Sequence, residues 1–287
     1  MLIASQRTGF QPLSHMTRLP SPLPDPKTLV EGLCRLSVQA GAAIMAHYEN
    51  GIEAARKTDD SPVTAADHDA EHVILDGLHR LAPDIPVVSE EQAAAGHIPE
   101  IGDRFFLVDP LDGTKEFLRR NGEFTVNIAL VENRLPLAGV VYAPAMDRLF
   151  YAFGPGNAYE RKIHPSADGS MDEADAPRRL AVRKPMPGGL VVAVSRTHRD
   201  HKTDEYLDHY DVKEFVVSGS SLKFCLIAAG EADLYPRHGR TMEWDTAAGH
   251  AILAAAGGSV TLLDGGPLLY GKTGRGLDNP YFVARGG

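Results

Sequence analysis

The sequence predicts a layered α/β protein whose two halves each contain a mixed sheet. Three features indicate this class: two amphipathic helices lie near the N-terminus, short apolar strands follow between residues 105 and 153, and strands alternate with helices from residue 190 to residue 263. This order is typical of sheets that are covered by helices. We expect a first domain at 27–155, a second at 156–287, and a flexible N-terminal extension at 1–26.

The composition restricts the functions that this chain can have. Its 287 residues carry a net charge of −9, and hydrophobic residues make up 43% of them. A soluble globular protein has this composition, whereas general nucleic-acid binding needs clustered basic charge. The two cysteines, Cys34 and Cys225, lie far apart and suit a reducing compartment rather than a disulfide framework. No nucleic-acid partner is therefore expected.

Signals for export or membrane insertion are not expected either. No apolar run approaches the ~18 residues that a membrane span requires. The first 15 residues are of mixed polarity and lack the continuous apolar core of a secretory signal. We therefore expect a cytoplasmic protein without a transmembrane segment. Peripheral attachment to the inner face of the cell membrane and the oligomeric state are left open.

Two helices are expected at the start of the first half. Prolines at positions 20, 22, 24 and 26 exclude a helix in the extension. Apolar residues such as Leu33 and Ile44 then recur at helical spacing, which predicts a helix over 27–48. The same spacing predicts a second helix that begins after Thr64 and ends near Pro83.

The remaining elements follow from apolar runs and turn residues. Asn133 lies between two runs rich in Val, Ile and Leu, which predicts a hairpin. The segment 164–179 is polar and is expected to be a surface loop. In chain order, the other expected elements are strands at 105–108, 124–132, 137–143, 146–153 and 190–195, a helix at 199–209, a strand at 214–218, a helix at 221–229, a strand at 232–235, a helix at 245–256 and a strand at 259–263.

The segment DPLDGT at 109–114 is the most informative motif of the chain. It follows an apolar strand and precedes residues that can form a helix, so that Asp109 and Asp112 can point at one place. Gly113 lets a ligand approach the backbone closely, and the start of the helix offers free N–H groups to an anion. Carboxylates and a phosphate at one place require a bridging divalent cation. The structural alternative is that both acids only cap the helix.

Further acidic positions can belong to the same site. Glu90 and Glu91 follow an apolar strand. Asp67 lies three residues after Thr64, and Asp245 stands at the start of a predicted helix. Each position has a structural alternative, namely a solvated sheet edge for the two glutamates, an acidic capping box for Asp67 and a helix cap for Asp245.

Brought together, these acids would repel one another unless cations were bound. Two carboxylates about 4 Å apart repel by roughly 4 kcal/mol at an effective dielectric constant of about 20. Hard oxygen ligands select Mg²⁺ rather than zinc. Spacing in the sequence does not establish that the acids converge, because only a fold can bring them together. The set is Asp67, Glu90, Asp109, Asp112 and Asp245.

These motifs resemble those of a known family. The segment 109–114, the pair Glu90-Glu91 and the segment WDTAA at 244–248 together are similar to the signatures of the inositol monophosphatase-like, Mg²⁺-dependent phosphatases. The resemblance covers about residues 27–285 and implies the αβαβα sandwich of the sugar phosphatases. The stretches most similar to the family's 3′(2′),5′-bisphosphate nucleotidases are KEF at 115–117, RNGEFTVN at 120–127 and GSSLKFC at 219–225.

The resemblance assigns roles at the acidic site. It implies two or three Mg²⁺ ions per active site, and it favours Glu90 over Glu91 as a direct ligand. Asp67 and Thr114 would hold and activate the attacking water. One metal ion would lower the pKa of a bound water and another would stabilise the leaving oxygen, so no covalent phospho-enzyme is expected. The implied metal ligands are Glu90, Asp109, the backbone carbonyl of Leu111, Asp112 and Asp245.

The resemblance also implies a small phosphorylated nucleotide as substrate. Adenosine 3′,5′-bisphosphate, a by-product of sulfur assimilation, would give AMP and phosphate, and its sulfated analogue is a second candidate. Lys223 and Arg237 would supply basic charge for a second phosphate, which favours a nucleotide over an inositol phosphate. Lithium would inhibit by competing at a magnesium position. The implied substrate contacts are Gly113, Thr114, Gly219, Ser220, Ser221, Lys223, Arg237 and Asp245.

Three other functions are weighed against this one. The first is a phosphatase for inositol phosphates or fructose 1,6-bisphosphate. The second is a regulator that binds metal or nucleotide and has lost catalysis, although every polar role that the mechanism requires is occupied. The third is a structural protein in which all the acids are caps and the turn at 219–221 is an ordinary start of a helix. Glu243, two residues before Asp245, has no role in any of these assignments.

Overall fold

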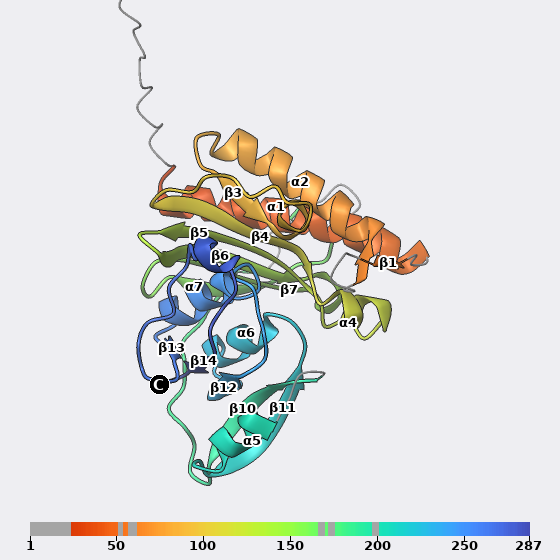
Figure 1. Ribbon diagram of the computed structural model, residues 1–287. Coiled ribbons are helices and arrows are strands. Elements are labelled where there is room, and N and C mark those ends of the chain that lie inside the picture. The colour runs from red at the N-terminus through yellow and green to blue at the C-terminus, as the bar shows by residue number, and fades with distance from the viewer. Residues whose placement is uncertain (1–23, 51–53, 57–61, 166–169, 172–175, 197–200) are drawn as a thin grey trace, which may run out of the picture.

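The computed structural model describes residues 24–50, 54–56, 62–165, 170–171, 176–196 and 201–287 (Figure 1). The extension expected at 1–26 therefore lies almost entirely outside the described residues. Within the described ranges, helices and sheets form alternating layers in the order α, β, α, β, α. The α/β sandwich with two mixed sheets is thus confirmed.

Helices α1 (Pro26–Asn50) and α2 (Ala65–Leu81) form the outer layer on one face of the larger sheet (Figure 1). Proline suits the first position of α1, because no helical partner exists there for an N–H group. Asp25 caps this helix, since its Oδ1 accepts hydrogen bonds from the backbone N–H groups of Lys27 and Thr28 at 3.1 and 3.2 Å. Both helices therefore lie where the apolar spacing predicts them.

The expectation about membrane-length segments needs a correction at α1. Among the described residues, α1 is the helix that is long and apolar enough to cross a membrane by length and composition alone. More than half of its apolar stretch is buried inside the protein. The apolar residues of α1 pack in the core beside α2 and the larger sheet, as in other buried amphipathic helices.

The larger sheet has seven strands in the order β3-β4-β5-β6-β7-β8-β9. Only β3 and β4 run parallel, and every other neighbouring pair is antiparallel. Asn133 and Arg134 turn the β5–β6 hairpin with φ of 50° and 67°, the left-handed region that a tight hairpin requires. The strands are β3 (Val87–Ser89), β4 (Arg104–Asp112), β5 (Thr125–Glu132), β6 (Leu135–Ala143), β7 (Arg148–Phe153), β8 (Ala158–Lys162) and β9 (Arg178–Arg179).

The smaller sheet has five strands in the order β11-β10-β12-β14-β13. Its first three strands are parallel, and β14 runs antiparallel between β12 and β13. A separate antiparallel pair, β1 with β2, precedes α2. The strands are β1 (Ala54–Arg56), β2 (Pro62–Thr64), β10 (Leu190–Ser195), β11 (Val212–Ser218), β12 (Leu234–Arg237), β13 (Ser259–Leu262) and β14 (Phe282–Arg285).

Two helices, α6 and α7, lie between the sheets, and α5 covers the far side of the smaller sheet (Figure 1). One buried cluster includes Phe105 and Val141 of the larger sheet, Phe224 of α6, Ile252 of α7 and Phe282 of the smaller sheet, so both halves share this core. The remaining helices are α3 (Glu90–Ala94), α4 (Thr114–Leu118), α5 (His201–Leu207), α6 (Leu222–Ala228), α7 (Ala247–Ala255) and the 3₁₀ turns Pro144–Met146 and Thr273–Arg275.

The sequence patterns miss five strands, namely β1, β2, β8, β9 and β14. The segment 164–179 was expected to be a loop, and that prediction is wrong at its end, where the two exposed arginines of β9 pair with β8. Two charged residues carry no apolar period, so pairing alone defines this strand. The short strands β8 and β14 are likewise identified only by their pairing with neighbouring strands. Because β8 and β9 complete the larger sheet, this sheet extends past residue 155, and the domain division there stays a prediction.

The packing of α7 on β6 predicts the effect of a methyl group at Gly139. A Cβ at this position would lie 2.6 Å from the carbonyl oxygen of Ala248 and 2.9 Å from Cβ of Ala251. The Gly139→Ala variant should therefore lose about 1–3 kcal/mol of unfolding free energy through overpacking. Urea denaturation measures the loss. Gly102→Ala is the control, because no other described residue has an atom within 4 Å of its added methyl, apart from its two chain neighbours. Equal losses in the two variants would contradict the packing argument.

Candidate active site

Strand β4 ends in the DPLDGT segment, where its regular pairing with β5 is interrupted. The register shifts between Asp109 and Asp112, and Asp109 is 1% exposed. Gly113 is the N-cap residue of α4 with φ of 93°, so neither aspartate caps this helix and the structural alternative is wrong here. A Cβ on Gly113 would lie only 2.4 Å from Ser220 Oγ. Glycine is thus required both by the left-handed backbone and by the close approach of the second half.

Three acidic side chains from separate parts of the chain converge beside this segment. One carboxylate oxygen each of Glu90, Asp109 and Asp245 can be chosen so that all three lie within 4.8 Å of one another. Glu90 begins α3, Asp109 lies in β4, and Asp245 precedes α7. Glu91 is buried and lies outside this group. The fold therefore brings together three of the acids that the sequence singled out.

Asp112 joins the acidic group to the second half of the protein. Its Oδ2 accepts hydrogen bonds from the backbone N–H of Ser221 at 2.8 Å, from Ser221 Oγ at 3.0 Å and from Asn127 Nδ2 at 3.3 Å. Ser221 Oγ also lies 2.7 Å from the carbonyl oxygen of Asp245. The turn at 219–221 is consequently attached to two of the expected ligand residues.

Asp67 and Thr114 lie next to each other, and Asp67 also has a structural role. Thr114 Oγ1 donates to Asp67 Oδ1 at 3.3 Å and lies 3.4 Å from the carbonyl oxygen of Leu111. Asp67 Oδ2 accepts from the backbone N–H and the hydroxyl of Thr64, both at 2.7 Å, which completes the capping box of α2. The capping box and the contact with Thr114 thus use different oxygens of one carboxylate.

The electrostatics of the acidic group suit a bound cation. Burial, followed by the negative charges of Asp112 and Glu90, raises the pKa of Asp245 well above its usual value. Burial also raises the pKa of Asp112, although the positive charge of Lys223 opposes that shift. Like charges that crowd in a partly buried place are stabilised by a cation. The donors are carboxylate and carbonyl oxygens, which fit Mg²⁺.

A cleft of about 240 Å³ opens beside the acids. Glu90, Asp112 and Asp245 line it together with Lys223 and Arg237. The cleft thus presents negative and positive charge to one bound molecule. Its remaining lining residues are Gly113, Thr114, Lys115, Glu116, Ser195, Gly219, Ser220, Phe224, Tyr235, Arg240, Thr241 and Thr246.

The turn at 219–221 is held in a strained conformation by its contacts. Ser220 has φ of 48°, and its hydroxyl lies 2.8 Å from the carbonyl oxygen of Asp112 and 2.9 Å from that of Glu123. Glu123 Oε2 accepts from the backbone N–H of Gly219 at 3.0 Å. Below the turn, Lys223 Nζ donates to the carbonyl oxygens of Ser218 and Ser220 at 3.2 and 2.6 Å. The turn is therefore preorganised by side chains from both halves.

The two cationic side chains of the cleft differ in their surroundings. Lys223 is buried, and desolvation lowers its pKa to about 8. Its ammonium group is engaged with backbone carbonyls, so it supports the turn. Arg237 is 8% exposed; its Nη2 donates to the carbonyl oxygen of Arg240, whereas its buried Nε has no hydrogen-bond partner among the described residues. A guanidinium that lines a cleft can bind an anion through charge-assisted hydrogen bonds.

A larger cavity lies elsewhere and does not carry this chemistry. It has a volume of about 480 Å³ and is lined by residues of α1, β7 and β8, including Cys34, Tyr151 and Arg161. None of the acids described above lines it. The acidic cleft is therefore the candidate active site, although it is the smaller of the two.

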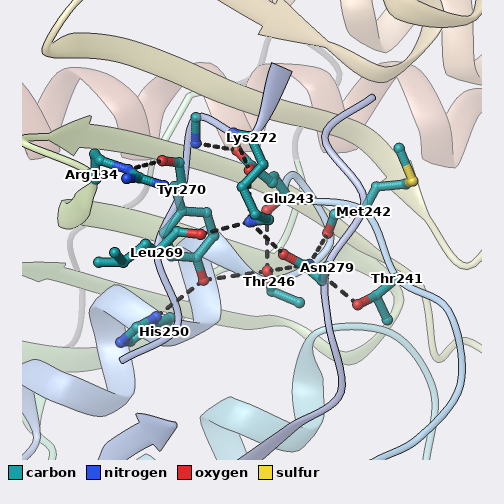
Figure 2. A network of polar contacts seen from close by, with 11 residues as sticks. Arg134, Thr241, Met242, Glu243, Thr246, His250, Leu269, Tyr270, Lys272 and Asn279 are labelled. Carbon is teal, nitrogen blue, oxygen red and sulfur yellow. Dashed lines mark hydrogen bonds and ion pairs between the residues drawn. The ribbon is translucent and has the colours of Figure 1, made fainter. Parts of the chain in front are cut away.

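The sequence patterns missed a buried polar network around Glu243 (Figure 2). Glu243, Lys272 and Asn279 lie at its centre and connect the segment 241–246 with the segment 269–279. The acid at Glu243, adjacent in sequence to the Trp-Asp motif, was the available signal. Its partners could not be inferred, because they lie about 30 residues further along the chain.

The fold and the site define a metal-dependent phosphatase, and the chain belongs to the inositol monophosphatase family, whose model matches residues 25–283. The chain is 49% identical over 234 residues to the 3′(2′),5′-bisphosphate nucleotidase CysQ of Salmonella typhimurium, which covers 81% of this chain and 89% of that protein. The CysQ of Escherichia coli K12 is 46% identical over 244 residues, with 84% and 94% covered. The crystal structure of CysQ from Bacteroides thetaiotaomicron matches with a TM-score of 0.74 at 36% identity, covering 90% of this chain and 97% of that one.

The crowding of the acids predicts the behaviour of an Asp245→Asn variant. Without metal, the variant should melt about 2 °C or more above the parent protein, because loss of about 1 kcal/mol of repulsion has this effect in a protein of this size. The amide oxygen can still accept from the backbone N–H of Met242, which lies 2.8 Å from Asp245 Oδ2. Added Mg²⁺ should raise the melting temperature of the parent and have little effect on the variant. Calorimetry with and without Mg²⁺ measures both effects; an equal rise in the two proteins would exclude Asp245 as a ligand.

Proposed function

We propose that this protein is a Mg²⁺-dependent phosphomonoesterase that converts adenosine 3′,5′-bisphosphate into AMP and phosphate. The observation that carries the proposal is one cleft that is lined by Glu90, Asp112 and Asp245 together with Arg237. The similarity to several CysQ nucleotidases over most of the chain supports the same substrate class. A substrate with one phosphate to be cleaved and a second to be recognised fits both charges of the cleft.

The acidic residues at the cleft would hold two or three Mg²⁺ ions. Glu90, Asp109, Asp112 and Asp245 would bind them through carboxylate oxygens, together with the carbonyl oxygen of Leu111. When bound, Mg²⁺ supplies positive charge to the phosphate oxygens and to the leaving oxygen. By family analogy, lithium would compete at one of these positions.

Asp67 and Thr114 would handle the attacking water. Because Thr114 Oγ1 donates to Asp67 Oδ1, the lone pairs of this hydroxyl remain available to accept a hydrogen bond from water. The water oxygen then forms a bond to phosphorus while the bond from phosphorus to the 3′-oxygen breaks. The proton lost by water passes through Thr114 to Asp67, and the 3′-oxygen takes a proton from solvent. The capping box fixes the orientation of the Asp67 carboxylate for this role.

Arg237 and the turn at 219–221 would recognise the nucleotide. We assign the 5′-phosphate to Arg237, and the contacts near the scissile phosphate to Gly113, Ser220 and Ser221. Gly219 and Lys223 would keep the turn in place, with Lys223 adding positive charge beneath it. The sulfated analogue carries the same 3′-phosphate and is a second substrate candidate. The proposal includes action in the cytoplasm; attachment to a membrane has no support from the relatives and is not part of it.

A comparison of substrates tests the proposed activity. With Mg²⁺ present, phosphate release should be fastest from adenosine 3′,5′-bisphosphate and slower from inositol 1-phosphate and fructose 1,6-bisphosphate. The Asp112→Asn variant should lower kcat by more than the ~10- to 100-fold loss that residues supporting a metal ligand typically cause. A colorimetric phosphate assay measures both. Fastest release from an inositol phosphate would overturn the substrate, and release by Asp112→Asn at the parent rate would overturn the metal site.

The position of Arg237 in the cleft predicts how the enzyme distinguishes a substrate with two phosphates from a substrate with one. In the Arg237→Met variant, KM for adenosine 3′,5′-bisphosphate should rise about 10-fold or more, because a hydrogen bond to a charged group contributes about 1.5–3 kcal/mol. KM for adenosine 3′-monophosphate, which lacks the 5′-phosphate, should stay within about 2-fold. Steady-state kinetics with both substrates measures the difference. Arg104→Met, at an exposed arginine paired with Glu132 away from the cleft, is the control; an equal rise for both substrates would contradict the assignment of the 5′-phosphate to Arg237.

A further inference from the structure

A buried carboxylate lies two residues before the expected ligand Asp245. The side chain of Glu243 is completely buried. Its Oε2 accepts from the backbone N–H of Gly271 at 2.7 Å, and its Oε1 accepts from the backbone N–H of Lys272 at 2.8 Å and from Lys272 Nζ at 2.7 Å (Figure 2). Glu243 therefore attaches the backbone of the 269–279 segment to the turn that contains Asp245.

Lys272 and Asn279 complete this network without leaving a donor unused. Lys272 Nζ donates to Glu243, to the carbonyl oxygen of Leu269 at 2.6 Å and to Asn279 Oδ1 at 3.1 Å, which accounts for its three protons. Asn279 Nδ2 lies 2.7 Å from the carbonyl oxygen of Met242 and 3.1 Å from Thr246 Oγ1. A fully satisfied buried network of this kind holds one geometry in preference to others.

The network reaches the carboxylate of Asp245 through one residue. The backbone N–H of Met242 donates to Asp245 Oδ2 at 2.8 Å, while the carbonyl oxygen of the same residue accepts from Asn279. Glu243 also donates its backbone N–H to the carbonyl oxygen of Leu277 at 2.9 Å. The position of Met242, and with it the direction of the Asp245 carboxylate, is thus set by contacts with the 269–279 segment.

We propose that Glu243 and Asn279 are positioning residues that direct Asp245 at the metal site and thereby raise the affinity for metal. This inference rests on the metal centre of the proposed function. A purely structural role would not require a charge here, because replacing a buried ion pair by apolar residues is often neutral for stability. Partners that orient a ligand, by contrast, typically change metal affinity by about 10- to 100-fold when they are altered.

The Glu243→Gln variant tests the proposal through metal binding. Glutamine keeps the size of the side chain and one acceptor oxygen, but it cannot accept well from Gly271, Lys272 N–H and Lys272 Nζ together. The dissociation constant for Mn²⁺ and for Mg²⁺, measured by titration calorimetry without substrate, should rise about 10-fold or more. Steady-state KM for the nucleotide at saturating Mg²⁺ should change less than about 3-fold, because Glu243 is proposed to act on metal binding. Both readouts use the full-length protein.

Asp233→Asn is the matched control. Asp233 is another buried carboxylate; it accepts from the backbone N–H of Val191 at 2.7 Å and pairs with Arg183 at 2.8 Å, and it does not line the cleft. Both variants lose the charge of a buried acid that is paired with a cation. We expect both to melt at a lower temperature and only Glu243→Gln to lose metal affinity.

Two further variants keep the proposal testable if Glu243→Gln does not fold. Glu243→Gln combined with Lys272→Met removes both charges of the pair, and Asn279→Leu removes the amide contacts with Met242 while keeping the size of the side chain. Each should weaken Mn²⁺ binding about 10-fold. Parent-like Mn²⁺ affinity in a folded variant, or an equal loss in Asp233→Asn, would overturn the positioning role and leave the proposed function intact. A parent protein that binds neither Mn²⁺ nor Mg²⁺ would overturn both.

Discussion

The repulsion among the buried acids is the constraint on which the rest of the site depends. Carboxylate oxygens of Glu90, Asp109 and Asp245 come within 4.8 Å of one another, and Asp112 raises the pKa of Asp245 further. Acidic side chains that were free to rotate would move apart under such repulsion. In this protein the acids are held instead by hydrogen bonds from backbone N–H groups, as at Leu111 for Asp109 and at Met242 for Asp245.

The layered fold supplies the rigidity that this arrangement needs. Glu90 follows β3 and Asp109 lies in β4, and these two strands of the larger sheet are parallel. Asp245 precedes α7, which is packed between the two sheets (Figure 1). Because α6 and α7 share one core with both sheets, the acid from the second half cannot drift away from the acids of the first. Ser221 adds a direct link, since it binds Asp112 through its N–H and its hydroxyl.

Charge balance explains how an acidic protein accommodates a phosphorylated substrate. The net charge of −9 opposes anion binding over the whole surface, so attraction must be local. Metal ions would reverse the sign of the charge at the acids of the cleft, and Arg237 provides fixed positive charge in the same cleft. Lys223 lines the same cleft, and its ammonium group also donates to the carbonyl oxygens of Ser218 and Ser220. The turn that contains Ser220 and Ser221 consequently supports Asp112.

Local patterns in the sequence determined the helices, most strands, the hairpin at Asn133 and the identity of the acidic motifs, because helical period, turn residues and caps depend on neighbours a few residues away. The same patterns did not predict β9 and β14, which are defined only by pairing with neighbouring strands. Only the tertiary structure decided that the acids converge, that the second carboxylate oxygen of Asp67 contacts Thr114, and that Glu243 binds the 269–279 segment. These contacts join segments tens to more than a hundred residues apart, and their geometry arises from the packing of whole layers rather than from spacing along the chain.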